Sequence, residues 1–573
     1  MKKISKFVLL ITFFCFAFLA INFGLTKSII IKTIGYYLFY ITTLLFVINV
    51  FTIFIESKYK IKNNFLDIFF IFLLLTVIIF YEFLKPVIKF DFKSIIIIII
   101  TMRNFLSLYK SVGYEKKFDY FSKKVLVHPA KTIISSYLFL ILTGTTLLML
   151  PISSADNQGI GFINSFFTIT SAVCVTGLTV VDTATKFSLF GQIVILLMIQ
   201  IGGLGIMIFS YFAAFIIGRK ISFEEKLTIS FMLNDNDMKN IYKNIKSMII
   251  ITFLIEVIGA LFLLTKFSSS FGLSPKALFF SIFHSISAFC NAGFALFTDS
   301  LISYKSSLIL NFTICVLIIL GGLSFSVILN IFDNIKNFAL NKILKKRQIF
   351  TNLNLNTIIV LIVTSFLILS GILIIYGFEH DNILLKEDLK TQYLAAIFQS
   401  ITLRTAGFNT IDISSLHNYT YIIMILFMFI GGASGSTAGG IKVNTVGVIF
   451  AYFKSVLNNQ EKITLFKKSI SKDIITRAFL IVTLSGIYVF ISALVLSISE
   501  KFSMIQILFE VGSAFGTVGL STGITPFLSN FGKVIIIMLM FIGKIGPLTI
   551  LLAVSRKVEN SPVEYPEANI TIG

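Results

Sequence analysis

A short phrase that ends in glycine occurs four times in the chain, each time between long hydrophobic segments. The copies are SAVCVTG at 171–177, SAFCNAG at 287–293, ITLRTAG at 401–407 and SAFGTVG at 513–519. Their final glycines lie 116, 114 and 112 residues apart. So regular a period indicates one ancestral unit repeated four times. Four units arranged around an axis can enclose a single central site, which is the strongest constraint on the fold.

The composition places the chain in a membrane. Of its 573 residues, 56% are hydrophobic and 13% are charged, and the mean hydropathy is +0.94. Segments long enough to cross about 30 Å of hydrocarbon recur along the whole sequence. We therefore expect an all-α polytopic membrane protein. The four cysteines and four histidines are isolated from one another, so the sequence predicts neither a metal cluster nor the clustered acid/base groups of a membrane enzyme.

The formal charge of +21 is concentrated in alternate loops. The basic clusters are Lys116, Lys117, Lys123 and Lys124; Arg219, Lys220, Lys239, Lys243 and Lys246; Lys345, Lys346 and Arg347; and Lys462, Lys467, Lys468 and Lys472. The segments between them hold the glycine phrases and contain few lysines and arginines. By the positive-inside rule, we expect the basic loops and both termini to be cytoplasmic and the glycine phrases to face outward. The charge therefore indicates membrane topology and not nucleic-acid binding.

The chain divides into an N-terminal block and four units. Residues 1–127 form an accessory transmembrane block of about four hydrophobic segments without a glycine phrase. Its lone Arg103 favours a helical bundle over a voltage sensor, which needs basic residues at every third position. The units are expected at 128–235, 236–350, 351–470 and 471–573.

Each unit is predicted to be a helix, a half-span with a pore loop, and a second helix, in a pseudo-fourfold arrangement. The half-spans at 162–175, 276–291, 392–405 and 502–517 are too short to cross a bilayer. They are expected to be re-entrant helices followed by irregular backbone, which is tolerated at membrane depth only where it is buried in protein or lines a wet cavity.

The glycine phrases suit a monovalent cation. Rings of backbone carbonyls can replace the water shell of such an ion, as in potassium channels, and glycine permits the unusual backbone angles that this requires. No Asp or Glu lies in the four phrases, which disfavours a divalent-selective ring of carboxylates. The expected ion-binding residues are Val175, Thr176, Gly177 and Leu178; Asn291, Ala292, Gly293 and Phe294; Thr405, Ala406, Gly407 and Phe408; and Thr517, Val518, Gly519 and Leu520.

Acidic residues follow three of the glycines, at Asp182, Asp299 and Asp412. They could ring an outer mouth and concentrate cations there. They could equally be turn or helix-capping residues. The sequence supports both interpretations.

The second helix of each unit contains a dipeptide that begins with glycine at the same position. These dipeptides are Gly202-Gly203, Gly321-Gly322, Gly431-Gly432 and Gly543-Lys544. Packing of small residues explains the glycines. It does not explain an ammonium at membrane depth, which is costly and usually functional. We expect Lys544 to lie below the central site and to set an electrostatic barrier.

The third unit continues as GGASGSTAGGIK from 431 to 442. So much Gly and Ser interrupts a helix and predicts a flexible loop in mid-membrane. Gly435 and Gly440 have the spacing of a nucleotide-binding P-loop, but Ile441 stands where the lysine is needed and no strand precedes them. We expect a movable gate instead, formed by Gly435, Ser436, Thr437, Ala438, Gly439, Gly440 and Lys442 together with Lys544.

These motifs closely resemble those of the Trk/Ktr/HKT superfamily of potassium transporters, particularly its Ktr-type membrane subunits. Segments 171–178, 290–294, 404–410, 435–442, 546–548 and 565–567 carry the resemblance, which covers about 128–573. It implies a pseudo-fourfold potassium pore with one filter glycine per unit and a gating loop in the third. Gly177 is typical of potassium carriers, because members that carry sodium tend to have serine there. At Lys544 the family usually has arginine, whose planar fork lysine lacks.

The resemblance also implies a homodimer in a bacterial plasma membrane, bound to a cytoplasmic ring of KtrA/TrkA-like nucleotide-binding subunits. No cofactor is expected on the chain itself, so a nucleotide would act only through that partner. The function indicated is K+ uptake down its electrochemical gradient. The alternatives are a sodium-dependent or sodium-conducting transporter, the membrane subunit of an ATP-driven pump and a membrane enzyme.

Overall fold

A computed structural model describes residues 29–56, 129–205, 241–343, 353–460, 462–466 and 468–554, with isolated residues between 11 and 104. The chain is helical, apart from a two-stranded antiparallel ladder of β1 (Thr464–Leu465) and β2 (Lys468–Ser469) in the described part. The expected all-α class is confirmed. Lys116, Lys117, Lys123, Lys124, Arg219, Lys220, Lys239, Lys345, Lys346, Arg347, Lys467 and segment 565–567 lie outside the described residues.

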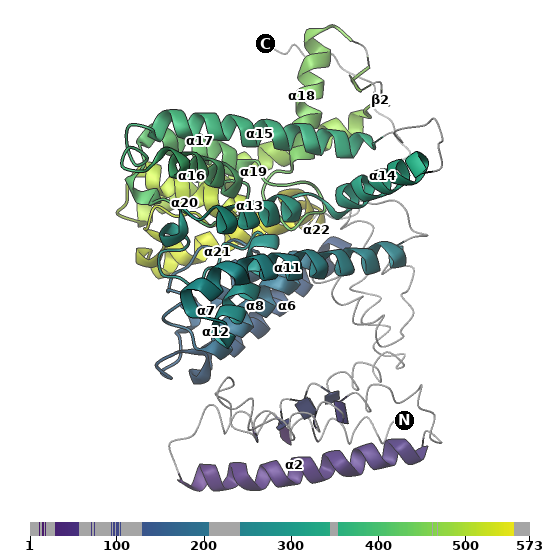
Figure 1. The fold of residues 1–573 in the computed structure, drawn as a ribbon, viewed down its shortest axis with the longest axis vertical. Helices are drawn as coiled ribbons and strands as arrows, with labels where there is room; N and C mark the ends of the chain where they lie inside the picture. Colours follow the sequence, from purple (N-terminus) through teal and green to yellow (C-terminus); the bar gives the residue numbers. More distant parts are fainter. Residues whose placement is uncertain are drawn as a thin grey trace.

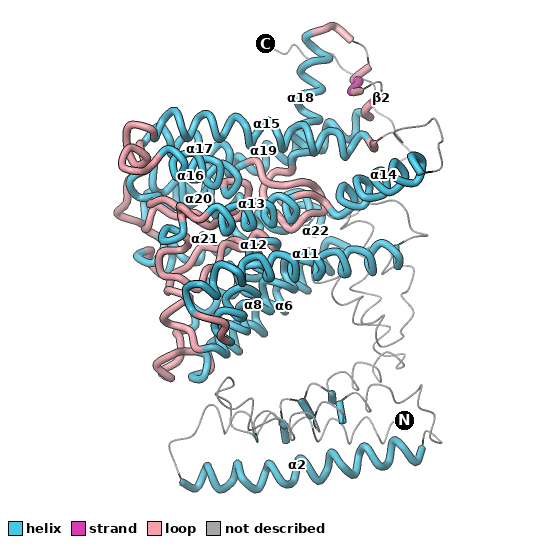
Figure 2. Tube along the Cα trace, in the orientation of Figure 1, coloured by secondary structure: helices cyan, strands magenta, loops and turns pink. Residues whose placement is uncertain are grey.

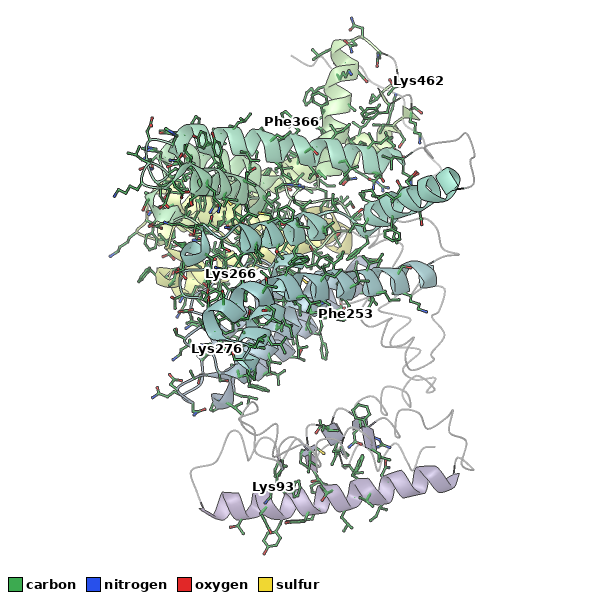
Figure 3. All side chains as sticks on the ribbon, in the orientation of Figure 1. Lys93, Phe253, Lys266, Lys276, Phe366 and Lys462 are labelled. Carbon is green, nitrogen blue, oxygen red and sulfur yellow. The ribbon has the colours of Figure 1, made fainter. Side chains whose placement is uncertain are left out.

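Four long helices begin the four units. They are α6 (Pro129–Met149), α11 (Ile241–Phe271), α15 (Leu355–Glu379) and α19 (Lys472–Ser499), and each is long and apolar enough to cross a membrane. Their flanks expose large apolar side chains, such as Phe253 on α11 and Phe366 on α15 (Figure 3). An exposed apolar flank suits contact with lipid and not with water.

A short helix follows each long one, as the half-spans predict. These helices are α7 (Phe162–Val173), α12 (Pro275–Phe289), α16 (Leu389–Thr402) and α20 (Met504–Gly516). With 12 to 15 residues they rise only about 18–23 Å, less than the hydrocarbon thickness. Hydroxyl caps fix two of their starts: Ser274 Oγ accepts the Ala277 N–H, and Ser503 forms a capping box with Gln506.

The second helices of the last three units are interrupted. α13 (Leu308–Gly322) bends by 103° into α14 (Phe325–Ile343), and α21 (Asn530–Ile545) bends by 92° into α22 (Pro547–Val554). A loop separates α17 (Asn418–Phe429) from α18 (Val443–Leu457). In the first unit, α8 (Leu189–Leu204) is followed by residues outside the described part.

Four connections between helices contain short 3₁₀ turns, and the loops gather at the left-hand end of the helices in Figure 2. The turns are η2 (Pro151–Ser153), η3 (Ile302–Tyr304), η4 (Ile413–Ser415) and η5 (Thr525–Phe527). One ion pair there joins the second and third units, because Lys305 Nζ lies 2.5 Å from Glu387 Oε1.

In the N-terminal block, α2 (Ile29–Glu56) lies apart from the four units in Figure 1. Its Phe39 and Phe46 pack with Ile97 and Ile100 in a small core. Arg103 is fully buried, and its Nη1 donates to Asn49 Oδ1 (2.8 Å). The accessory role of this block stays a prediction.

Two carboxylates tie the long helices to the N-terminal ends of α17 and α21. Glu379, the last residue of α15, is fully buried and accepts hydrogen bonds from the His417 N–H (3.1 Å) and the Thr420 hydroxyl (2.5 Å). Glu500, directly after α19, accepts bonds from the N–H (3.2 Å) and hydroxyl (2.5 Å) of Ser529, the N-cap of α21. In both, a negative charge meets the positive end of a helix dipole.

We expect the substitution Glu379→Ala to destabilise the protein by about 1–3 kcal/mol, because it leaves buried donors without an acceptor. Thermal unfolding in detergent measures the effect. Asp381→Ala is the matched control, since the Asp381 side chain is 92% exposed. Equal unfolding temperatures for the two variants would contradict the role of Glu379.

Candidate functional site

The four repeated glycines line one cavity. Gly177, Gly293, Gly407 and Gly519 all border a space of about 470 Å³. Each glycine follows the C-terminal end of its short helix by three to five residues. The fold thus brings together four segments that the sequence separates by more than a hundred residues.

The glycines touch one another in a closed cyclic order. A Cβ atom placed on Gly177 would fall within 3.0 Å of the Ala292 carbonyl oxygen, and a Cβ on Gly293 would lie equally close to the Ala406 carbonyl oxygen. A Cβ on Gly407 would likewise meet the Val518 carbonyl oxygen, and a Cβ on Gly519 would meet the Thr176 carbonyl oxygen, which closes the cycle. Backbone meets backbone at all four contacts. We call residues 175–178, 291–294, 405–408 and 517–520 the turn ring.

Each turn contains two left-handed residues. The glycines have φ between +69° and +95°, and the residues two positions earlier are also left-handed: Val175 (57°), Asn291 (60°), Thr405 (71°) and Thr517 (50°). Such angles are unfavourable for branched side chains. The glycine position could be predicted from the sequence, but the second position could not, because Val and Thr give no signal for a left-handed backbone.

Hydroxyls from the short helices hold the turns. In the first and fourth units, Ser171 and Ser513 accept the N–H of Gly177 and Gly519, each at 3.0 Å. In the second unit, Ser287 Oγ donates to the Phe294 carbonyl (2.8 Å). The third unit has Ile401 in the serine position, and the neighbouring Thr402 donates to the Phe408 carbonyl (2.7 Å) instead.

The side chains of the turn ring face the protein. Leu178, Phe294, Phe408 and Leu520 are at most 2% exposed and belong to hydrophobic cores behind the turns. Any contact that these four residues make with a ligand in the ring is therefore through the backbone. The Thr176 and Thr517 hydroxyls are buried and have no hydrogen-bond partner among the described residues.

The three acidic residues after the glycines differ in position. Asp182 and Asp299 line the cavity, whereas Asp412 is not among the lining residues. All three also close turns, as the capping interpretation predicts. Asp182 accepts the Ala184 N–H (2.8 Å), Asp299 accepts the Ser303 N–H (2.9 Å) and Asp412 caps η4 at the Ser414 N–H (3.0 Å).

The Asp412 carboxyl has a lowered pKa. Partial burial raises the pKa of Asp412, but hydrogen bonds from Ser414 and Ser415 outweigh burial and leave it below its ordinary value. This carboxylate therefore stays ionised at neutral pH.

The glycine pairs of the second helices pack against the ends of the short helices. A Cβ on Gly202, Gly321 or Gly543 would collide with the carbonyl oxygen of Val173, Phe289 or Phe515 respectively. The packing explanation for these glycines is confirmed. It also aligns Gly543 with Gly202 and Gly321, so that Lys544 occupies the place of Gly203 and Gly322.

The second helix of the third unit is interrupted by a loop at residues 430–442. This loop is held by hydrogen bonds and lies directly against the turn ring. Its two ends pair in a bridge between Ile430 and Ile441. Thr437 donates to the Gly321 carbonyl through both its N–H (3.3 Å) and its hydroxyl (2.9 Å), and the Gly440 N–H donates to the Gly543 carbonyl (3.2 Å). A Cβ on Gly439 would strike the Thr517 side chain. The 430–442 loop therefore joins the second, third and fourth units.

Two lysines bind carbonyl oxygens of the 430–442 loop. Lys544 Nζ donates to the Thr437 carbonyl and Lys442 Nζ donates to the Ala438 carbonyl, each at 2.5 Å. Lys544 thus contacts the loop. It does so without the planar guanidinium of the arginine that the family resemblance leads one to expect at this position.

Two buried charged residues were not among the expected site residues. Arg404, the one charged residue in the four phrases, is 6% exposed, and its Nη2 donates to the Gly431 carbonyl (3.3 Å) at the start of the loop. Glu510, an isolated acid on the apolar α20, accepts bonds from the Thr522 N–H (3.0 Å) and the Thr525 hydroxyl (2.8 Å). For Arg404, a lone charge within the four phrases was the available signal, and for Glu510 it was a lone charge in an apolar helix.

Comparison with known proteins supplies independent information. The family model described as TrkH, cation transport protein, matches residues 98–563. The match begins earlier than the expected limit of 128 and therefore extends into the N-terminal block. The crystal structure of the potassium transporter TrkH from Vibrio parahaemolyticus aligns with a TM-score of 0.59 at 17% identity, covering 86% of this chain and 98% of that one. At that identity the likeness concerns the fold alone.

Two relatives named for ion uptake are similar over most of their length. Ktr system potassium uptake protein B of Bacillus subtilis is 38% identical over 79% of this chain and 98% of its own. Potassium/sodium uptake protein NtpJ of Enterococcus hirae is 36% identical over 78% of this chain and 97% of its own. With a family model that spans most of the sequence and relatives of nearly full length, the chain belongs to the TrkH family of cation transport proteins.

Proposed function

We propose that this protein takes up K+ across a bacterial plasma membrane, and that the turn ring is its selectivity filter. The observation that carries the proposal is the convergence of four left-handed glycine turns on one cavity. The relatives named for potassium uptake support the choice of ion. An inside-negative membrane potential would drive the flux with about 2.3 kcal/mol per charge per 100 mV.

The chemistry of the ring suits a large monovalent cation. A desolvated ion needs oxygen atoms in place of its water, and the turns offer backbone carbonyls, which K+ channels use for the same purpose. The short helices end at the ring, so their negative dipole ends favour a cation there. Asp182 and Asp299 add negative charge at the mouth.

The 430–442 loop is proposed as the gate. It lies against the third and fourth turns, because Gly431 abuts Thr405 and Gly439 abuts Thr517. The Lys544 ammonium fixes its Thr437 carbonyl. Opening would require that bond to break, together with the bonds of Thr437 and Gly440 to the neighbouring helices.

The proposed assembly is a homodimer with a cytoplasmic ring of nucleotide-binding regulatory subunits. The name "Ktr system" of two relatives supports a multi-component transporter. On this proposal the nucleotide acts through the partner, and both termini of the chain are cytoplasmic.

We expect Gly177→Ala to abolish ion uptake. Its φ of +95° disfavours a side chain, and the added Cβ would fall within 3.0 Å of the Ala292 carbonyl. Rubidium uptake by proteoliposomes and growth of a potassium-uptake-deficient bacterium at low K+ measure the loss. Gly377→Ala in α15 is the control, because nothing lies within 4 Å of its added Cβ. Full uptake by the Gly177 variant would refute the filter assignment.

Sodium is the second candidate ion, because one relative is named for potassium and sodium. We expect the wild type to carry rubidium at all external sodium concentrations and to exclude a sodium tracer. Gly177→Ser is the comparison and should admit sodium. Equal sodium and rubidium uptake by the wild type would instead make the protein a sodium-conducting transporter.

We expect Lys544→Met to raise uptake in the absence of regulatory subunits. Loss of a charged hydrogen bond removes about 1.5–3 kcal/mol from the closed state, which predicts an increase of roughly tenfold or more. Deleting residues 434–439 should also raise the flux. Lys533→Met is the control on the same helix, since Lys533 binds Asn164 (3.3 Å) and not the loop. Unchanged flux in the Lys544 variant and the deletion would count against a gate.

A further inference from the structure

A buried polar pair joins the first and second units away from the turn ring. Glu256, in the middle of α11, is 3% exposed. One of its oxygens, Oε2, accepts a hydrogen bond from Gln200 Nε2 of α8 (3.2 Å), and the other, Oε1, has no partner among the described residues. A carboxyl group with a single neutral donor is poorly satisfied at membrane depth.

The third unit has an apolar residue at the position of Glu256, and the other three units have apolar residues at the position of Gln200. Ser285 Oγ donates to the Glu256 carbonyl (2.6 Å), and in the third unit Ser400 Oγ donates to the Ile368 carbonyl (2.7 Å), so Ile368 is the counterpart of Glu256. Gln200 stands two residues before the packing glycine of its helix. Its counterparts are Ile319, Phe429 and Phe541. The fold therefore does not require a polar pair at this position.

The described residues place no cation on the Glu256 carboxyl. The α8 helix carries no charged residue, and in α13 the single titratable group is Cys315. On α12, Lys276 is at the outer start, and His284 uses both ring nitrogens, at the Phe280 carbonyl and the Leu296 N–H. On α11 itself, Lys246 and Lys266 stand about three turns away from Glu256 in either direction.

A buried carboxylate without a cation is strongly destabilised, whereas the protonated acid is neutral and can also donate. Thr252, one turn earlier on the same face of α11, is fully buried, and its hydroxyl has no partner in the described part. It is available as the acceptor of the acid O–H. The contrast is Glu510, whose carboxylate accepts bonds from Ser521, Thr522 and Thr525.

The pair also touches the back of the turn ring. Gln200 Oε1 accepts a weak bond from the Cys290 thiol (3.8 Å), and Cys290 directly precedes the left-handed Asn291 of the second turn. Cys290 also abuts Gly203 of α8. The Cys290 thiol lies within electrostatic reach of both Glu256 and Lys544.

We propose that Glu256, with Gln200, is a proton-binding site within the membrane, and that release of its proton strengthens cation binding at the turn ring. The deprotonated form adds one negative charge behind the second turn, and this charge attracts a cation in the low-dielectric interior. The same charge redirects the Gln200 amide and with it the Cys290 contact. The proton released by the Glu256 carboxyl passes to water, so the step needs no other reactant.

Infrared spectroscopy of the complete protein tests the proton site without any assumption about transport. We expect the wild type to show the C=O stretch of a buried carboxylic acid that diminishes as the pH rises. Glu256→Gln should lack that band, and Glu510→Gln should retain it. Identical carboxylic-acid bands in the wild type and in Glu256→Gln would overturn the proposal.

The effect on transport rests on the proposed function and is measured separately, as rubidium uptake by proteoliposomes over a range of pH. The apparent KM of the wild type should fall as the pH rises, by up to about tenfold per pH unit on the acidic side, because the tight-binding form is populated in proportion. Glu256→Gln should show a pH-independent KM near the acidic limit of the wild type. Asp381→Asn, at an exposed carboxyl, should behave as the wild type.

The remaining outcomes are also decisive. An unaltered pH profile in Glu256→Gln, with a normal infrared result, would overturn the link to the turn ring while leaving the proton site intact. If sodium at fixed pH abolished the acid band and shifted the KM in the wild type alone, the site would bind sodium and the proton assignment would be wrong. Failure of all uptake would bear on the proposed function and not on the infrared result.

Discussion

The glycines of the four turns meet backbone to backbone. Each glycine lies against a carbonyl oxygen of the next turn, and a single Cβ would bring the contact below 3.0 Å. The surrounding elements allow the four turns to come this close together. The short helices end where the turns begin, the serine and threonine hydroxyls fix the turn backbones, and Gly202, Gly321 and Gly543 let the second helices lie directly on the short-helix ends.

The backbone strain in the ring is balanced by its surroundings. Val175, Thr405 and Thr517 are branched residues in a left-handed conformation, which costs on the order of 1 kcal/mol or more each. Such angles persist only where neighbouring structure determines them. Here that structure includes the 430–442 loop, since Gly431 packs close to Thr405 and Gly439 close to Thr517. The loop and the ring therefore share contacts, and a change in one alters the support of the other.

Much of this arrangement could be predicted from the sequence. The regular period, the half-span lengths and the glycines gave the helical units and their short helices, because these features depend on local composition and repeat. The second left-handed residue, the use of Thr402 in place of a serine and the contacts of Arg404 could not be predicted, because they arise where segments far apart in sequence meet. Asp412 shows the same limit: its spacing from the glycine resembled that of Asp182 and Asp299, but it caps η4 and is not among the residues that line the cavity.

The two sharp corners in the second helices have a mechanical consequence. α14 turns away from α13 by 103° directly after Gly321 and Gly322, and α22 turns away from α21 by 92° directly after Lys544. These same residues supply the bonds that hold the 430–442 loop. A torque applied to α14 or α22 would therefore act on the loop within one helical turn of each corner, and the long lipid-facing helices could stay where they are.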